Sequence, residues 1–285
     1  MPTTEPSVDL VRDRYLDLVK RSLTGALAED NDSILGGVRT DGSPSFKKRA
    51  ASAVGKFAQR YNVEIAVKKP YDPQARQNGR DWPSRAESMI GLKRMDNLQE
   101  CIAQIIADDV PGDLIETGVW RGGACIFMKA NLDAWGDTTR TVWLADSFEG
   151  LPAPDVSAFP ADQGDELYKR GGLAVGPEIV KHNFERYGLL DDRVKFLVGW
   201  FKDTLPTAPV EQLSLVRLDG DMYESTWQAI ENLYPKLSSG GFLVIDDFGS
   251  FVDQAQQAVH DYRAQHGITD EIIDIDGHGA YWRKS

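Results

Sequence analysis

The sequence predicts an α/β fold, in which a mostly parallel sheet carries helices on both faces. Expected strands and helices alternate between residues 95 and 266, and several strands are continuous apolar runs rather than alternating patterns. Such runs are typical of parallel strands that are buried on both faces. In addition, two strands with no helix between them end the chain, separated by DGHG at 276–279, a sequence typical of a hairpin loop.

Each element follows from local periodicity and from helix-breaking residues. One face of a predicted helix at 8–27 gathers the apolar side chains Val11, Tyr15, Leu18, Val19 and Leu23. Residues 30–85 are rich in Gly, Pro and charge, so irregular structure with one helix between residues 47 and 61 is expected. Further helices are expected at 95–107, 122–135, 177–187, 223–237 and 251–266. Strands are expected at 113–119, 142–148, 194–198, 213–218, 241–246, 271–275 and 279–283, with a long loop at 149–176.

Composition and charge narrow the classes of partner. The 285 residues are 41% apolar and carry a formal net charge of −12. An acidic surface repels phosphate backbones and anionic lipid, which argues against nucleic acid and membranes and favours a small-molecule substrate. No signal peptide or membrane span is evident, and Cys101 and Cys125 have no metal or disulfide spacing, so a cytoplasmic protein with buried thiols is expected. The N-terminal helix could pack on its own domain or on a second subunit.

The first three strand ends carry the features of a nucleotide-like ligand site, because ligands of open α/β sheets bind outside the carboxyl ends of the strands. After the first strand, Glu116-Thr117-Gly118 leads through Arg121 to Gly122 and Gly123. This turn lets backbone approach a ligand, but it is not GxGxxG. The Glu116 carboxylate suits the ammonium of a methionine moiety better than a phosphate. A purely structural tight turn is the alternative.

The second and third strand ends suggest contacts to a nucleoside. Asp146 after the second strand can accept hydrogen bonds from both ribose hydroxyls, next to Ser147, and Phe148 could stack on adenine. The alternative is a helix cap and a core phenylalanine. After the third strand, Gly199 and Trp200 could contact adenine, although core packing of Trp200 explains that residue equally well.

The fourth and fifth strand ends bring four carboxylates together. One strand ends in Asp219-Gly220-Asp221 and the other in Asp246-Asp247. Burying that much negative charge without a cation costs on the order of several kcal/mol. A divalent ion with oxygen ligands relieves the cost, and oxygen-only ligation selects magnesium, calcium or manganese over zinc. A metal that binds a hydroxyl lowers its pKa, and a nearby carboxylate can take the proton. Three aspartates suffice for the metal, so Asp221 is the candidate general base.

These segments together resemble the TylF-type O-methyltransferases of antibiotic biosynthesis. The matching segments are YLDL (15–18), SMIGLKR (88–94), ETGVWRGGACI (116–126), ADSF (145–148), YGLLDD (187–192), GWFKD (199–203), DGD (219–221) and IDD (245–247). The resemblance covers most of residues 85–285.

The resemblance implies a class I methyltransferase fold, Rossmann-like, with a seven-stranded sheet at 95–285 and an N-terminal helix and lid extension at 1–94. It implies S-adenosylmethionine as methyl donor and a deoxysugar hydroxyl of a glycosylated natural product as acceptor. It also implies Mg²⁺ on Asp219, Asp246 and Asp247, with Asp221 as base. Ser88 and Met89 would fold over the cofactor, which the glycine turn and Asp146-Ser147 would bind. The loop at 149–176 would form a substrate lid.

Three rival functions remain open at this point. A catechol-type methyltransferase would use a bound metal in the same way to activate a hydroxyl of a small aromatic diol. A nicotinamide-dependent oxidoreductase is disfavoured by the absence of GxGxxG after the first strand. A non-catalytic binding protein on the same scaffold cannot be separated by fold alone, but it has no need for four costly carboxylates.

Overall fold

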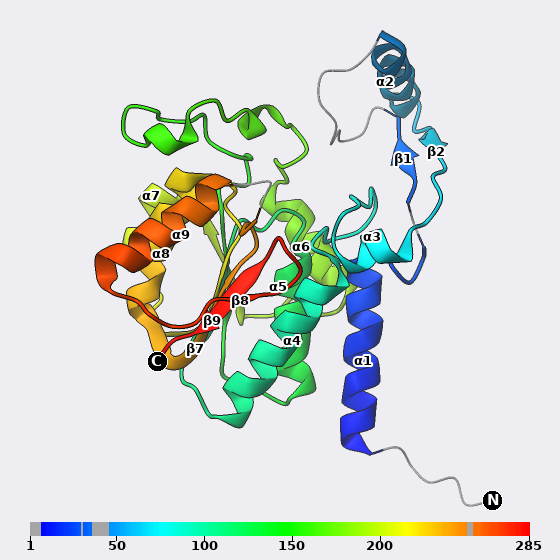
Figure 1. Ribbon diagram of the computed structural model, residues 1–285. Helices are drawn as coiled ribbons and strands as arrows, with labels where there is room; N and C mark the ends of the chain where they lie inside the picture. Colours follow the sequence, from blue (N-terminus) through cyan, green and yellow to red (C-terminus); the bar gives the residue numbers. More distant parts are fainter. Residues whose placement is uncertain (1–6, 30, 36–45, 250–252) are drawn as a thin grey trace, which may run out of the picture.

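The protein is described by a computed structural model that covers residues 7–29, 31–35, 46–249 and 253–285 (Figure 1). Its centre is a seven-stranded sheet in the order β5-β4-β3-β6-β7-β9-β8. The strands are β3 (Asp113–Thr117), β4 (Val142–Asp146), β5 (Val194–Val198), β6 (Leu213–Leu218), β7 (Leu237–Ile245), β8 (Ile273–Asp274) and β9 (Ala280–Arg283). Neighbouring strands are parallel except at β9, which is antiparallel to β7 and β8. This order confirms the predicted class I methyltransferase fold.

Helices cover both faces of the sheet and divide the apolar core in two. On one face lie α1 (Val8–Leu23), α4 (Gly91–Ala107), α5 (Gly123–Ala134) and α6 (Pro177–Arg186). On the other lie α7 (Phe201–Thr204), α8 (Tyr223–Leu233) and α9 (Asp253–His266). The first two residues of the predicted helix 251–266 lie outside the described residues. In the part of the chain that the structure describes, no helix is long and apolar enough to cross a membrane.

The orientation of α1 corrects the predicted apolar face. The helix ends at Leu23 rather than 27, because Thr24 caps it and Gly25 follows with a φ of 69°. Its buried side includes Leu16, Val19 and Leu23, which join the core shared with α5. Val11 and Leu18, predicted to share that side, are more than half exposed. Leu16 instead completes the buried face, since residues 16, 19, 20 and 23 follow one another at helical spacing.

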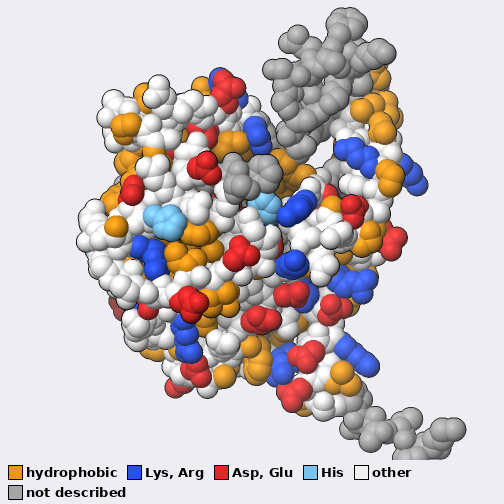
Figure 2. All heavy atoms as spheres, viewed as in Figure 1, with side chains coloured by type: hydrophobic (Ala, Val, Ile, Leu, Met, Phe, Trp, Pro, Cys, Tyr) orange, Lys and Arg blue, Asp and Glu red, His pale blue; other side chains and the backbone are white. Residues whose placement is uncertain are grey.

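The segment before α4 is mostly irregular, as predicted, and projects from the sheet domain. It contains β1 (Ser33–Ile34) paired with β2 (Ala66–Val67), α2 (Phe46–Gln59) and α3 (Pro73–Gln77). Figure 1 shows α2 standing away from the sheet, and Figure 2 shows apolar side chains on this projection. Val54, Phe57 and Tyr61 are each more than half exposed. Helix α2 confirms the helix predicted between residues 47 and 61.

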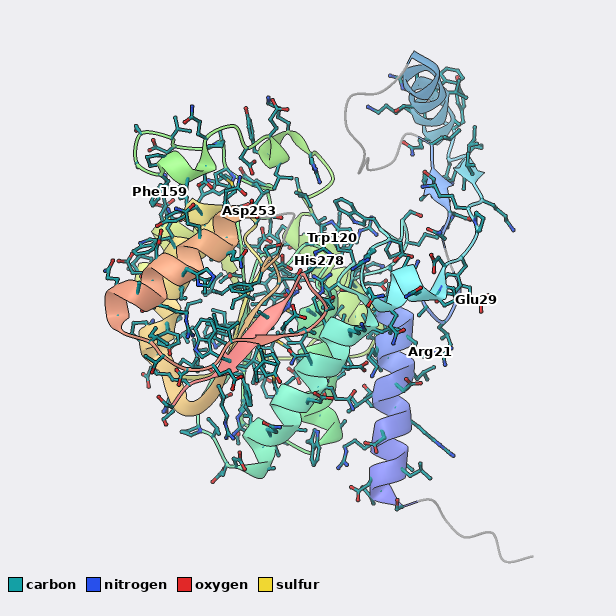
Figure 3. The ribbon with its side chains drawn as sticks, in the orientation of Figure 1. Arg21, Glu29, Trp120, Phe159, Asp253 and His278 are labelled. Atoms are coloured by element: carbon teal, nitrogen blue, oxygen red, sulfur yellow. The ribbon has the colours of Figure 1, made fainter. Side chains whose placement is uncertain are left out.

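The loop after β4 lies over the carboxyl edge of the sheet (Figure 1). It was predicted as a loop at 149–176, and it contains two short 3-10 turns, η1 (Pro160–Asp162) and η2 (Leu167–Lys169). We call residues 149–176 the lid. In Figure 3, Phe159 lies on the lid, while Trp120 and His278 lie below it near the sheet edge. The lid therefore covers the strand ends that the sequence singles out.

Candidate active site

A cavity of about 500 Å³ lies between the carboxyl ends of the strands and the lid. Loops after five parallel strands line it with Gly118, Trp120, Asp146, Ser147, Trp200, Phe201, Lys202, Asp219, Gly220, Asp221, Asp246 and Asp247. The N-terminal segment and α8 add Trp82, Met89, Glu224, Ser225 and Gln228. The lid closes it with Gly150, Leu151, Pro152, Ala153, Asp155, Leu167, Arg170 and Leu173. The cavity thus has the place expected for a ligand of an open α/β sheet.

The turn after β3 needs glycine because two strand ends meet there. Gly118 has a φ of 87°, and a Cβ at this position would lie 1.6 Å from the carbonyl oxygen of Asp219. Gly123 is also confined, because a Cβ there would lie 2.5 Å from the Cβ of Ser88. The glycines therefore bring the ends of β3 and β6 into contact and seat Ser88 against the start of α5.

Asp146 closes the turn after β4 and still faces the cavity. Its two carboxylate oxygens accept hydrogen bonds of 2.6 Å from the backbone N–H groups of Val119 and Phe148. Each oxygen of a carboxylate has a second lone pair, so Asp146 can also accept bonds from ligand hydroxyls. Burial raises the pKa of this carboxyl, against the lowering effect of the backbone donors.

The carboxylates after β6 and β7 form a compact cluster. Asp219, Asp246 and Asp247 each offer a carboxylate oxygen, and these oxygens all lie within 4.8 Å of one another. Asp221 is tied to the same cluster, because its backbone N–H donates to Oδ2 of Asp247 over 2.9 Å. The predicted convergence of four aspartates from two neighbouring strands is therefore what the structure shows.

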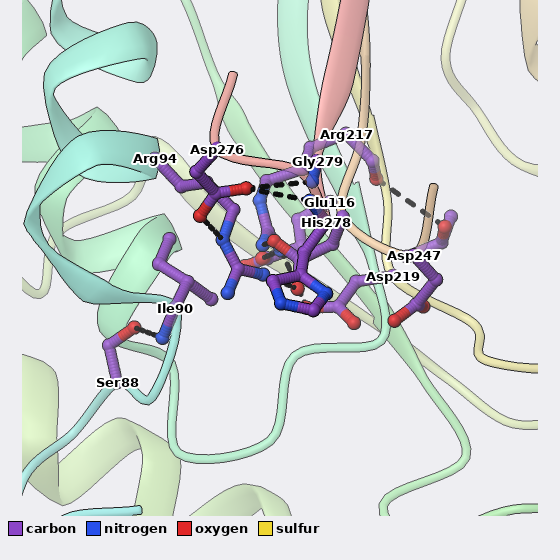
Figure 4. Close-up of polar contacts among 12 residues, drawn as sticks. Ser88, Ile90, Arg94, Glu116, Arg217, Asp219, Asp247, Asp276, His278 and Gly279 are labelled. Atoms are coloured by element: carbon purple, nitrogen blue, oxygen red, sulfur yellow. Dashed lines mark hydrogen bonds and ion pairs between the residues drawn. The ribbon is translucent and has the colours of Figure 1, made fainter. Parts of the chain in front are cut away.

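Two buried arginines, which the sequence reasoning missed, lie beneath this cluster (Figure 4). Arg217 on β6 is 1% exposed and forms ion pairs with Glu116, with Asp246 and, over 2.7 Å, with Asp219. Arg94 on α4 pairs with Asp246 over 2.6 Å and with Asp276 over 3.1 Å. The cluster therefore has internal cations as well as acids, and Asp246 is held in place from two sides.

Burial and the neighbouring charges shift the pKa values of these acids in opposite directions. Burial would raise the pKa of Asp246, but Arg217 and Arg94 outweigh it, so this pKa is lowered. Burial and neighbouring carboxylates hold the pKa values of Asp219 and Asp247 well above the ordinary value. Burial, with Asp246 next, raises the pKa of Asp221 to about 6. Negative charge at this site thus exceeds what the two arginines balance.

Several predicted site residues lie beside the cavity rather than on its wall. Glu116 is 2% exposed and its carboxylate is occupied by Arg217 and by the Cys125 thiol, which donates over 2.7 Å. The Arg121 guanidinium donates to the carbonyl oxygens of Ser84 and Ala86 and so holds the segment before Met89. The other predicted site residues that do not line the cavity are Ser88, Thr117, Gly122, Gly123, Phe148 and Gly199.

The cavity wall also contains residues that were not predicted. Trp82 and Trp120 meet edge to face with ring centroids 6.2 Å apart, and the Trp120 indole N–H donates to the carbonyl of Gly172 in the lid. Their sequence signal is weak, because single tryptophans in an irregular segment have no periodicity. Arg217 had a sequence signal, since a cation lies in a mostly apolar strand two residues before Asp219 and therefore on the same face.

A Rossmann-like sheet in this order, with a glycine turn after β3, an acid after β4 and an open cavity at the strand ends, defines a class I methyltransferase. The family model for macrocin O-methyltransferase (TylF) matches residues 12–284. The chain therefore belongs to the macrocin O-methyltransferase family and is an O-methyltransferase, as the sequence motifs predicted.

Individual relatives agree with this assignment. The chain is 50% identical over 276 residues to the 8-demethyl-8-(2,3-dimethoxy-alpha-L-rhamnosyl)-tetracenomycin-C 4'-O-methyltransferase of Streptomyces olivaceus, covering 95% of this chain and 93% of the relative. It is 50% identical over 272 residues to the demethyldecarbamoylnovobiocin O-methyltransferase of Streptomyces niveus, with the same coverages. The solved structure of the O-methyltransferase NovP superposes with a TM-score of 0.81 at 42% identity, covering 96% of this chain and 99% of that one.

Proposed function

We propose that this enzyme transfers the methyl group of S-adenosylmethionine to a sugar hydroxyl of a glycosylated natural product, with Mg²⁺ held by Asp219, Asp246 and Asp247. The observation that carries the proposal is the carboxylate cluster on the wall of the cavity, next to Asp221. The relatives support the acceptor class, because their names describe methylation of rhamnosyl and novobiocin derivatives.

The donor set of the cluster fits magnesium. The three ligands are carboxylates, the hard oxygen donors that Mg²⁺ prefers. Both oxygens of Asp246 accept from arginine, but each keeps a lone pair for a metal. Burial and the neighbouring carboxylates raise the pKa values of Asp219 and Asp247, and a bound divalent cation would favour their ionised forms. A divalent ion bound here would lower the pKa of a coordinated sugar hydroxyl and fix its orientation.

The side chains of this chain then have separate tasks. Asp221, with a pKa of about 6, is mostly ionised at neutral pH and can accept the hydroxyl proton as the methyl group is transferred. Arg217 and Arg94 keep Asp246 ionised and correctly placed. Asp146 would accept hydrogen bonds from the ribose of S-adenosylmethionine; it lines the cavity together with Met89 and Trp200. The lid excludes water from the reacting atoms.

A methyl-transfer assay tests the proposal directly. The enzyme is incubated with methyl-labelled S-adenosylmethionine and a panel of deoxysugar glycosides, with catechol as the comparison acceptor. We expect label on a glycoside, no label in EDTA, and recovery on addition of Mg²⁺. Full activity in EDTA would refute the metal, and label on catechol alone would refute the sugar acceptor.

A further inference from the structure

Asp162 is a buried acid in the lid, and no cation among the described residues forms an ion pair with it. The lid is largely exposed to solvent, yet Asp162 is 0% exposed. Burial, and to a smaller extent the acid Asp165, raise the pKa of Asp162 against the lowering effect of its backbone hydrogen-bond donors. Burying a carboxylate without a partner is costly, so its hydrogen bonds must offset the loss of water.

The partners of Asp162 are the first N–H groups of α8. Its two oxygens accept from the backbone N–H of Tyr223 over 2.7 Å and of Glu224 over 2.9 Å. The residue at the N-cap position of α8 is Met222, whose thioether is only a weak hydrogen-bond acceptor, and its side chain makes no capping hydrogen bond. Asp162 therefore provides the missing cap from about 60 positions away, where the helix dipole favours negative charge.

These two hydrogen bonds connect the lid to the catalytic turn. The turn 219–222 is tight, since Asp221 has a φ of 59° and the Met222 N–H donates to the Gly220 carbonyl over 2.6 Å. Helix α8 starts at the next residue, so whatever fixes its first N–H groups also fixes the end of this turn. Between lid residues 151–171 and the described residues outside the lid, these are the two hydrogen bonds that the structure shows.

The lid segments on both sides of Asp162 line the cavity. Gly150–Ala153 precede it, and Leu167, Arg170 and Leu173 follow it. Phe159 adds an apolar contact at the same place, with its ring centroid 6.1 Å from that of Tyr223. Asp162 itself does not reach the cavity. Its position is thus suited to hold the lid wall at a fixed distance from Asp221 without touching substrate.

We propose that Asp162 is a positioning residue that latches the lid onto the start of α8 and so shapes the acceptor part of the active site. The inference rests on the proposed function for its kinetic consequences. The residues proposed to bind S-adenosylmethionine, such as Asp146 and Gly118, lie at the edge of the sheet, and their positions do not depend on Asp162. Loss of the latch is therefore expected to weaken binding of the methyl acceptor much more than binding of the methyl donor.

The test compares Asp162→Asn and Asp162→Ala with Glu166→Gln. Glu166 lies in the same lid, and among the described residues its exposed side chain pairs with exposed Lys169 alone. Glu166→Gln therefore removes one negative charge from the lid and leaves the Asp162 hydrogen bonds intact. In both Asp162 variants we expect KM for the glycoside to rise about tenfold or more, because a misplaced wall loses substrate orientation. S-adenosylhomocysteine affinity should stay within about threefold, and amide exchange over residues 151–171 should accelerate. Glu166→Gln should match the wild type in all three measurements.

The alternative is that Asp162 only caps α8. In that case the melting temperature would fall while KM stayed within about twofold of wild type and lid exchange stayed unchanged, which would overturn the proposal. The milder Asn variant, checked by circular dichroism, keeps the test valid if the Ala variant fails to fold. If the wild type methylates no glycoside, the proposed function fails, and lid exchange alone decides the latch. Equal exchange in Asp162→Asn and Glu166→Gln would then overturn it.

Discussion

Replacing Arg217 by methionine tests whether this arginine balances the buried acids. The side chain is fully buried and pairs with Glu116, Asp219 and Asp246, so its loss takes the cation from Glu116 and Asp219 and leaves Asp246 with Arg94 alone. Breaking a buried ion pair from one side costs about 3–5 kcal/mol. For a chain of this size that corresponds to a fall in melting temperature of roughly 10 °C.

Urea unfolding in EDTA measures the cost of Arg217→Met. The exposed pair of Arg85 and Glu64 provides the control, and Arg85→Met should cost at most about 1 kcal/mol. Adding Glu116→Gln to Arg217→Met should recover part of the loss, since one unbalanced charge is removed. A cost for Arg217→Met no larger than for Arg85→Met would refute the reasoning.

Three further predictions concern the catalytic turn and its chemistry. Asp221→Asn should lower the rate of methyl transfer by about a thousandfold, which is within the range of general base catalysis. Its affinity for S-adenosylhomocysteine should stay within a few-fold of wild type, and a wild-type rate would remove Asp221 as base. The pH profile of kcat/KM should fall on the acid side at or below about pH 6, because protonated Asp221 cannot accept the hydroxyl proton; an acid limb centred above pH 7 would contradict this assignment. Gly118→Ala should destabilise the protein by about 3 kcal/mol or more, because its Cβ meets the Asp219 carbonyl. Gly136→Ala has a similar φ but no neighbour within 4 Å, so it should cost only about 1–2 kcal/mol in urea unfolding, and equal costs would show that the close approach is unimportant.

Much of the sheet could be predicted because its strands are local patterns. The apolar runs at β6 and β7 place Asp219 and Asp246 at strand ends, and adjacent parallel strands bring those ends together. The face of α1 was harder to predict. Both its buried Leu16 and its exposed Leu18 are apolar, and only tertiary packing separates them.

The electrostatic balance of the site depends on contacts between distant residues. The pairing of Glu116 with Arg217 follows from strand register, in which these two residues lie opposite each other. The register could be predicted only after the order of the strands was known. Asp162 had no signal at all, because its partners are backbone N–H groups about 60 positions away and the lid has no periodicity.

The central claim is that the carboxylate cluster holds a divalent metal, and calorimetric titration of Mg²⁺ into the protein saturated with S-adenosylhomocysteine tests it most directly. We expect one ion per chain, and binding at least about tenfold weaker in Asp247→Asn, because this substitution removes one ligand charge. Equal binding in the two proteins, or no binding by a folded wild type, would contradict the claim.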